Sequence, residues 1–226
     1  MGTVAVLASG GLDSCALVGD LARRHTVRPL YIACGLAWEQ EERLALDRFL
    51  AALDSPAVEP VTVLPAPAAA LYGEHWSITG RGVPGWRAPD IEVELPGRSL
   101  LLLTTAAVWC SRHDVEEIVL GTLAGNPMPD ASPAFFQDFE RCLNTGLAPH
   151  RIVIRRPLAD LAKDAVIAAF PDLPLHETLT CMAPTHDATG VLHCGACNKC
   201  AERHDAFRRA GIADATRYRN DPGTGA

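Results

Sequence analysis

The stretch Ala8-Ser9-Gly10-Gly11-Leu12-Asp13-Ser14 stands between two apolar runs and decides the fold of this chain. The run before it, Val4-Ala5-Val6-Leu7, has the length of one buried strand, and the run after it, Cys15-Ala16-Leu17-Val18, begins an apolar helix. Two successive glycines allow a tight turn that a ligand can approach closely. The first N–H groups of the helix and its dipole bring positive potential to that turn. The sequence therefore predicts a strand, an anion-binding turn and a helix.

Length and composition favour one α/β domain with a small appendix. The chain has 226 residues, of which 48% are hydrophobic and 21% are charged, as is usual for globular proteins. Its formal net charge of −7 makes nucleic acid an unlikely partner, because nonspecific binding to phosphates needs clustered Lys and Arg. No basic segment precedes the first apolar run, and the most apolar stretch, 100–110, is too short to cross a bilayer. We expect a cytoplasmic protein without a membrane partner.

Strands and helices alternate along the chain, which predicts an α/β fold with a doubly wound parallel sheet. Prolines confine the third strand, which we expect to be short or at an edge. The charged face of the second helix is expected in solvent, whereas the third helix, without a polar face, is expected to be buried on most sides. After the first strand and a first helix ending near 24–25, the expected strands are 27–34, 58–64, 118–122 and 151–155, and the expected helices are 39–53, 100–112, 135–143 and 160–170.

Two segments are expected beside the glycine turn. Open parallel sheets hold ligands beyond the carboxyl ends of their strands, so the turn at 34–36 should face the same crevice. Residues 65–96 show little periodicity and many Gly and Pro, which indicates a pocket wall or lid, or else an irregular surface. Trp76 and Trp86 in this segment could stack on a planar ring or simply pack in the protein.

Four of the eight cysteines crowd near the C-terminus at metal-ligand spacing. Four thiolates suit a tetrahedral Zn²⁺ with no open position, which predicts a structural metal. An iron–sulfur cluster, a redox Cys-x-x-Cys pair and unligated thiols are the alternatives, and His186 or His193 could replace the first cysteine. The predicted ligands are Cys181, Cys194, Cys197 and Cys200. The other cysteines are expected in the core: Cys15, Cys34, Cys110 and Cys142.

The Ser-Gly-Gly-x-Asp-Ser string at a first strand-to-helix turn resembles the PP-loop of the ATP pyrophosphatase superfamily. It lacks the lysine of a Walker-type loop. The resemblance implies that the loop grips the pyrophosphate that leaves when ATP adenylylates a substrate oxygen, with Asp13 as a Mg²⁺ contact. An ordinary glycine turn with Asp13 as a helix cap is the alternative. The nucleotide contacts implied by the resemblance are Ala8, Ser9, Gly10, Gly11, Leu12, Asp13, Ser14, Ile32, Ala33 and Gly121.

Further motifs, spread over nearly the whole chain, resemble the QueC family of 7-cyano-7-deazaguanine synthases. They include Pro96-Gly97-Arg98 before an apolar helix, Pro157-Leu158 with Lys163 on the next helix, and Cys194-Gly195-x-Cys197-x-x-Cys200-x-x-Arg203. The resemblance implies that ATP activates the carboxylate of 7-carboxy-7-deazaguanine, that ammonia gives the amide, and that a second ATP gives the nitrile (preQ0). It also implies a homodimer. The implied catalytic residues are Asp13, Ser14, Arg98 and Lys163.

Residues 121–136 depart from the family's pattern, because Ala134, Phe135 and Phe136 stand where the family carries Asp, Cys and Arg. That exchange removes polar partners for a deazaguanine, so a related carboxylate is an alternative substrate. Sulfur transfer or tRNA thiolation through Cys34 or Cys110, and nucleotide sensing without catalysis, are further alternatives. The expected organisation is an ATP-binding α/β domain over 1–175, a small helical zinc-binding segment over 176–220 and a flexible tail over 221–226.

Overall fold

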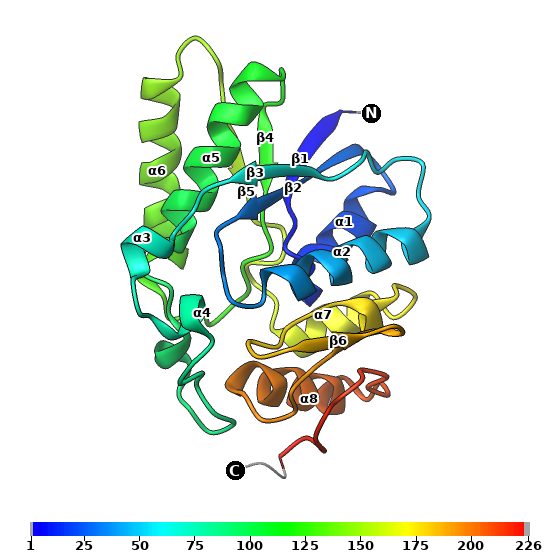
Figure 1. The fold of residues 1–226 in the computed structure, drawn as a ribbon. Helices are drawn as coiled ribbons and strands as arrows, with labels where there is room; N and C mark the ends of the chain where they lie inside the picture. The colour runs from blue at the N-terminus through cyan, green and yellow to red at the C-terminus, as the bar shows by residue number, and fades with distance from the viewer. Residues whose placement is uncertain (1, 224–226) are drawn as a thin grey trace.

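The centre of the molecule is a five-stranded sheet, seen in a computed structural model that describes residues 2–223 (Figure 1). All neighbouring strands are parallel, and their order is β3-β2-β1-β4-β5. The chain therefore starts in the middle of the sheet and winds first to one edge and then to the other, which confirms the doubly wound α/β prediction. The strands are β1 (Thr3–Leu7), β2 (Thr26–Ala33), β3 (Thr62–Pro65), β4 (Glu117–Val119) and β5 (Val153–Arg155).

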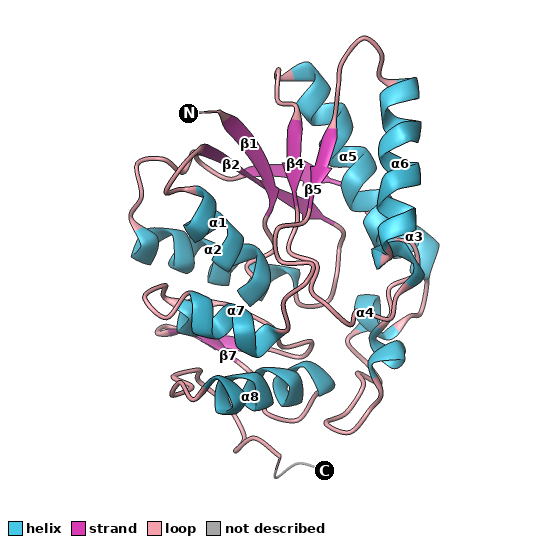
Figure 2. Ribbon diagram, turned by 180° about the vertical axis from the view of Figure 1, so that it is seen from behind, coloured by secondary structure: helices cyan, strands magenta, loops and turns pink. Residues whose placement is uncertain are grey.

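Helices cover both faces of the sheet (Figure 2). Side chains of β1 alternate between two cores: Val4 and Val6 pack with α1, α2 and α7, whereas Ala5 and Leu7 pack with α5 and α6. A strand buried on both faces needs apolar residues at every position, which explains the unbroken run Val4–Leu7. The covering helices are α1 (Leu12–Leu21), α2 (Glu39–Leu53), α5 (Arg98–Arg112), α6 (Pro133–Gly146) and α7 (Lys163–Ala169).

Short helical turns occupy the connections. The segment between β3 and α5 contains α3 (Ala69–Tyr72), α4 (Trp76–Thr79) and η1 (Asp90–Val93), and η2 (Pro129–Ala131) precedes α6. No helix among residues 2–223 combines the length and the apolarity that crossing a bilayer requires.

The C-terminal segment lies on the side of the sheet to which the strands point, below the sheet in Figure 1. It contains η3 (Leu175–Glu177), an antiparallel hairpin of β6 (Thr185–Asp187) and β7 (Gly190–Leu192), and α8 (Asn198–Ala210), which packs on α7. Arg203 is fully buried and donates to Thr216 Oγ1 and to the Leu175 carbonyl, both at 2.7 Å. The domain boundary near residue 175 stays a prediction, and residues 224–226 of the predicted tail lie outside the described residues.

Several local expectations need correction. The third strand begins at Thr62 rather than residue 58, because Pro60 has no N–H for the ladder, although β3 is the edge strand that its prolines predicted. The first helix ends at Leu21, and residues 22–24 form a turn. Helix α5 is covered on one side only, so Leu100 and Val108 are 43% and 49% exposed. Cys142 is exposed on α6, whereas the other three scattered cysteines are buried as predicted.

Candidate functional site

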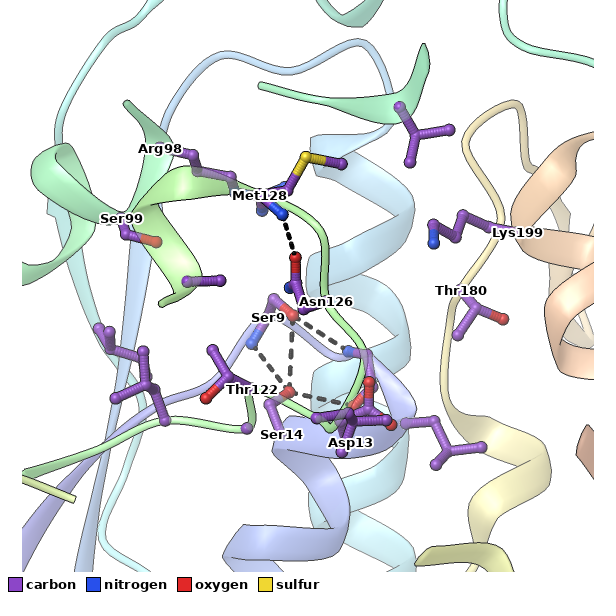
Figure 3. A pocket seen from close by; sticks show the side chains of 18 of the residues that line it. Ser9, Asp13, Ser14, Arg98, Ser99, Thr122, Asn126, Met128, Thr180 and Lys199 are labelled. Carbon is purple, nitrogen blue, oxygen red and sulfur yellow. Dashed lines mark hydrogen bonds between the residues drawn. The ribbon is translucent and has the colours of Figure 1, made fainter. Parts of the chain in front are cut away.

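The turn between β1 and α1 is held in shape by its own serines (Figure 3). The Ser9 N–H donates to Ser14 Oγ at 3.2 Å, the Ser14 hydroxyl donates to the Gly11 carbonyl at 3.0 Å, and the Gly11 N–H donates to Ser9 Oγ at 3.3 Å. Gly10 has a φ of +76°, and a Cβ at this position would collide with the carbonyl oxygen of Glu42. The turn thus requires glycine at position 10 and presents the N-terminus of α1 to the space in front of it.

A cavity of about 620 Å³ opens in front of this turn. Two predicted nucleotide contacts do not line it. Gly10 packs against Glu42 and Leu46 of α2, and its carbonyl accepts the N–H of Leu179, which follows η3, at 2.8 Å. Ala33 packs against the core under α1 and α2. The structure brings the other predicted residues together around the cavity: Ala8, Ser9, Gly11, Leu12, Asp13, Ser14, Ile32, Arg98, Gly121 and Lys163.

A chain of charged side chains links the turn to α8. Lys163 Nζ lies 3.4 Å from Asp13 Oδ2 and 2.9 Å from Glu202 Oε1, and Lys199 Nζ lies 2.8 Å from Glu202 Oε2. Burial opposes the charge on Lys163, but Asp13 and Glu202 outweigh it, so the pKa of Lys163 is raised. Burial also opposes the charge on Glu202, yet Lys163 and Lys199 lower its pKa to about 2. Lys163 and Glu202 are therefore both charged at neutral pH.

One carboxylate oxygen of Asp13 has no hydrogen-bond partner among the described residues. This atom, Oδ1, is buried. Burial raises the pKa of Asp13, and Lys163 opposes that effect only in part. A hard cation beside Oδ1 would offset the cost of the buried charge, and carboxylate oxygens are ligands that Mg²⁺ prefers. The residues of the turn therefore fit an anion accompanied by Mg²⁺.

Two connections form the side walls of the cavity. The predicted wall in residues 65–96 is confirmed, because Asp90, Val93, Glu94 and Leu95 from η1 and its C-terminal end line the cavity. The opposite wall is the loop after β4, where the Met128 N–H donates to Asn126 Oδ1 at 3.0 Å (Figure 3). This loop adds apolar lining at Leu123, Pro127, Met128 and Ala131.

Sequence reasoning missed several lining residues: Glu42, Thr180, Lys199 and Glu202. The expectation that Glu42 lies on the solvated face of α2 is wrong, because Glu42 is only 9% exposed. It shares the buried face of α2 with Ala45, Leu46 and Phe49, and this helical spacing was the available signal. Lys199 lies between two of the clustered cysteines and Glu202 lies two residues after the last one, where the sequence pattern indicated a metal site but no contact with the cavity.

The four clustered cysteines converge on one point. Their sulfur atoms lie within 4.8 Å of one another, with separations of 3.5 Å for Cys197–Cys200, 3.8 Å for Cys194–Cys200 and 3.9 Å for Cys181–Cys197. Zn–S bonds of about 2.3 Å in a tetrahedron place the sulfurs about 3.8 Å apart. Backbone N–H groups of Ala183 and Cys194 donate to Cys181 Sγ, which suits a thiolate. The cluster can therefore bind a metal ion such as zinc.

The two histidines considered as substitute ligands have other partners. His186 Nδ1 lies 3.0 Å from Glu41 Oε1, and His193 Nε2 accepts the Thr180 N–H at 3.2 Å. Cys181 is therefore the fourth member of the cluster. It precedes the β6–β7 hairpin, while Cys197 and Cys200 lie at the start of α8, so a bound metal would join the hairpin to that helix.

The fold and the site define an α/β protein with a glycine turn before a helix N-terminus at the carboxyl edge of a parallel sheet, and with a four-cysteine cluster beside it that can hold a metal ion. The chain belongs to the QueC family, because the family model described as "Queuosine biosynthesis protein QueC" matches residues 3–211. This finding confirms the resemblance seen in the sequence.

Curated relatives match nearly the whole chain. "7-cyano-7-deazaguanine synthase 1" of Sphingopyxis alaskensis is 31% identical over 225 residues, which cover 96% of this chain and 98% of the relative. "7-cyano-7-deazaguanine synthase" of Solidesulfovibrio magneticus is 32% identical over 231 residues, with 95% and 94% covered. A solved structure described as a predicted subunit of tRNA methyltransferase from Methanocaldococcus jannaschii covers 96% of this chain and 92% of its own. Its TM-score of 0.49 and 14% identity are too low to support an inference.

Proposed function

We propose that this chain is a cytoplasmic enzyme that uses ATP and ammonia to convert 7-carboxy-7-deazaguanine into 7-cyano-7-deazaguanine. Membership of the QueC family and the names of the similar proteins support the product. The observation that carries the ATP-dependent chemistry is the serine-held turn from Ser9 to Ser14, which faces a cavity of about 620 Å³ with the unpartnered Oδ1 of Asp13.

The proposed reaction activates the substrate twice. A carboxylate oxygen attacks the α-phosphorus of ATP and pyrophosphate leaves, then ammonia attacks the acyl carbon and expels AMP and a proton, which gives the amide. The amide oxygen attacks a second ATP and again releases pyrophosphate, and loss of AMP and the two nitrogen protons leaves the nitrile. Each activation converts an oxygen into part of AMP, a much better leaving group.

The residues around the cavity divide this task. Backbone N–H groups of the turn and the hydroxyls of Ser9 and Ser14 would hold the departing pyrophosphate. Arg98 and Lys163 would contact the phosphates, and Ile32 would border the adenine. Mg²⁺ held by Asp13 would supply neutralisation of the phosphate charge. Zinc in the cysteine cluster would be structural, because four protein ligands leave no open position.

The mass of the product tests the proposal. After incubation with ATP, ammonium and 7-carboxy-7-deazaguanine, we expect both carboxyl oxygens to be replaced by one nitrogen, with two AMP formed for each nitrile. Absence of AMP would reject the proposal. If the product stops at the amide, the enzyme is an amide synthase. AMP formation only with another carboxylate would identify a different substrate. The apolar lining at Leu123, Pro127 and Met128 is the reason to include related carboxylates in the assay.

A further inference from the structure

A second, smaller cavity adjoins the cavity in front of the turn between β1 and α1. It has a volume of about 140 Å³ and lies between α2, α4 and the segment that leads into the cysteine cluster. Both cavities share a set of lining residues, so a molecule in the smaller one can reach the phosphate side of the larger one. The shared residues are Glu42, Val93, Leu95, Arg98, Thr180 and Lys199.

One wall of the smaller cavity is aromatic. Trp38 and Trp76 stack with ring centroids 5.6 Å apart and an interplanar angle of 14°, and Met182 adds a polarisable side chain to the lining. Trp38 is only 5% exposed, so its ring is already held in place before any ligand arrives. Such a surface suits a planar heterocycle rather than an extended aliphatic chain.

The same cavity contains one buried carboxylate. Glu42 accepts the Tyr31 O–H at 3.0 Å through Oε2, and it forms no ion pair with any residue of the described part of the chain. A carboxylate so deep in the protein is costly unless N–H or O–H donors satisfy its oxygens. Burial raises the pKa of Glu42, and Arg98 together with hydrogen bonds from the Trp38 and Tyr31 side chains opposes this effect. An ionised carboxylate has about four acceptor sites, so Glu42 can still accept further N–H donors.

The geometry points to Glu42 as the residue that recognises the ring of the substrate, with the Trp38–Trp76 wall as the surface on which the ring lies. A 2-amino lactam, as in 7-deazaguanine, carries two neighbouring donors, the ring N–H and the exocyclic NH₂. One carboxylate can accept both, as it accepts two parallel N–H groups from arginine. The substituent on the five-membered ring lies at the other end of the bicycle, and Arg98 and Lys199, which line both cavities, supply the positive charge for its carboxylate.

This inference deepens the proposed function and rests on its assumption that the substrate is a 7-deazaguanine, but it can be tested without the reaction. The probes are 7-deazaguanine and 7-deazahypoxanthine, which lack the carboxylate and differ only in the 2-amino group, titrated calorimetrically without ATP. We expect the wild type to bind 7-deazaguanine about 10- to 100-fold more tightly, the range for a hydrogen bond to a charged group. In Glu42→Gln the preference should fall to near one, because the amide NH₂ cannot accept the 2-amino donor.

Two further variants keep the result interpretable. Asp47→Asn changes an exposed acid on the same helix and should keep the full preference. Tyr31→Phe removes the hydroxyl that orients Glu42 and should reduce the preference by a smaller factor, which serves as the test if Glu42→Gln does not fold. Equal binding of both rings by the wild type, no binding of either, or an unchanged preference in a folded Glu42→Gln variant would overturn the inference.

The titration separates this inference from the proposed function. A preference that depends on Glu42, together with no AMP from 7-carboxy-7-deazaguanine, would retain the ring site and reject the ATP chemistry. A Glu42→Gln variant that forms AMP and still prefers 7-deazaguanine as strongly as the wild type would retain the ATP chemistry and reject the ring site.

Discussion

Asp13 is the residue on which the proposed ATP chemistry depends most directly, and its replacement separates catalysis from folding. Because Lys163 keeps Glu202 as a partner at 2.9 Å, Asp13→Asn should leave no uncompensated charge and should fold normally. We expect the rate of AMP formation to fall by at least about 10²-fold, since the variant loses the proposed Mg²⁺ contact. Quantifying AMP and recording a thermal melt test this, with Asp20→Asn on the same helix as the control. Unchanged turnover would show that the assigned role is wrong.

Gly10 supports the turn through its backbone. Comparing its replacement with that of Gly35 measures how much the close packing at Gly10 contributes to the free energy of unfolding. Gly10 and Gly35 have nearly the same φ, +76° and +74°, but a Cβ would strike the Glu42 carbonyl only at Gly10 and meets nothing within 4 Å at Gly35. We expect Gly10→Ala to lower the free energy of unfolding by about 3 kcal/mol or more, and Gly35→Ala by about 1 kcal/mol. Urea denaturation gives both values. Equal losses would mean that the collision is relieved by a small backbone shift.

At the scale of elements, α8 joins the cysteine cluster to the large cavity in front of the turn between β1 and α1. Cys197 and Cys200 belong to the cluster, and Lys199 and Glu202 on the same helix start face the cavity. We expect purified protein to hold one zinc per chain. Cys197→Ser should lose the metal, lose at least about 2 kcal/mol of stability and form AMP more slowly, because the start of α8 loosens. Cys142→Ser, at an exposed cysteine, should change none of these. Elemental analysis showing zinc retained in Cys197→Ser would contradict the assignment.

Another link between elements, the ion pair between α2 and η3, makes stability depend on pH. Arg48 donates from Nε to Glu177 Oε2 at 2.7 Å and from a second nitrogen to Oε1 at 3.0 Å, and these bonds lower the pKa of Glu177. A carboxylate with a lowered pKa stabilises the fold above the ordinary glutamate value, about 4.3, and loses that effect as the pH falls through its own pKa.

The consequence is measurable by urea denaturation at two pH values. Glu177→Gln should cost up to about 1 kcal/mol at pH 7, because the pair is partly exposed to solvent, and clearly less near pH 3. Glu74→Gln, at a pair that is almost wholly in solvent, should have no measurable effect at either pH. A loss in Glu177→Gln that does not change with pH would rule out the ionic contribution.

Across the whole molecule, the features that local patterns determine were predictable from the sequence. The apolar run, the two glycines and the cysteine spacing gave the turn, the sheet class and the metal cluster, and α2 has the predicted bounds of 39–53. Contacts between distant segments were not predictable: no local pattern brings Lys199 to Asp13's cavity or stacks Trp38 on Trp76. The apolar composition of α5 also could not reveal that only one side of the helix is covered, because the sequence pattern of a helix does not show how many other elements pack against it.

The uncovered side of α5 gives an expectation about assembly. Leu100 and Val108 are 43% and 49% exposed, and Thr104 is exposed between them on the same face. Exposed apolar side chains that share one face are typical of subunit contacts, and the resemblance to the QueC family implies a homodimer. We expect the chain to sediment at twice its mass of 24.1 kDa.

Val108→Glu should shift this species toward monomer without lowering the melting temperature of the subunit, because the side chain is half in solvent within one chain. Ile91→Glu, at an exposed apolar residue on η1, should leave the dimer intact. A wild-type chain that sediments as a monomer at micromolar concentration would contradict the homodimer. A dimer that Val108→Glu does not affect would place the contact on another surface, because a buried glutamate without a partner costs more than one apolar contact contributes.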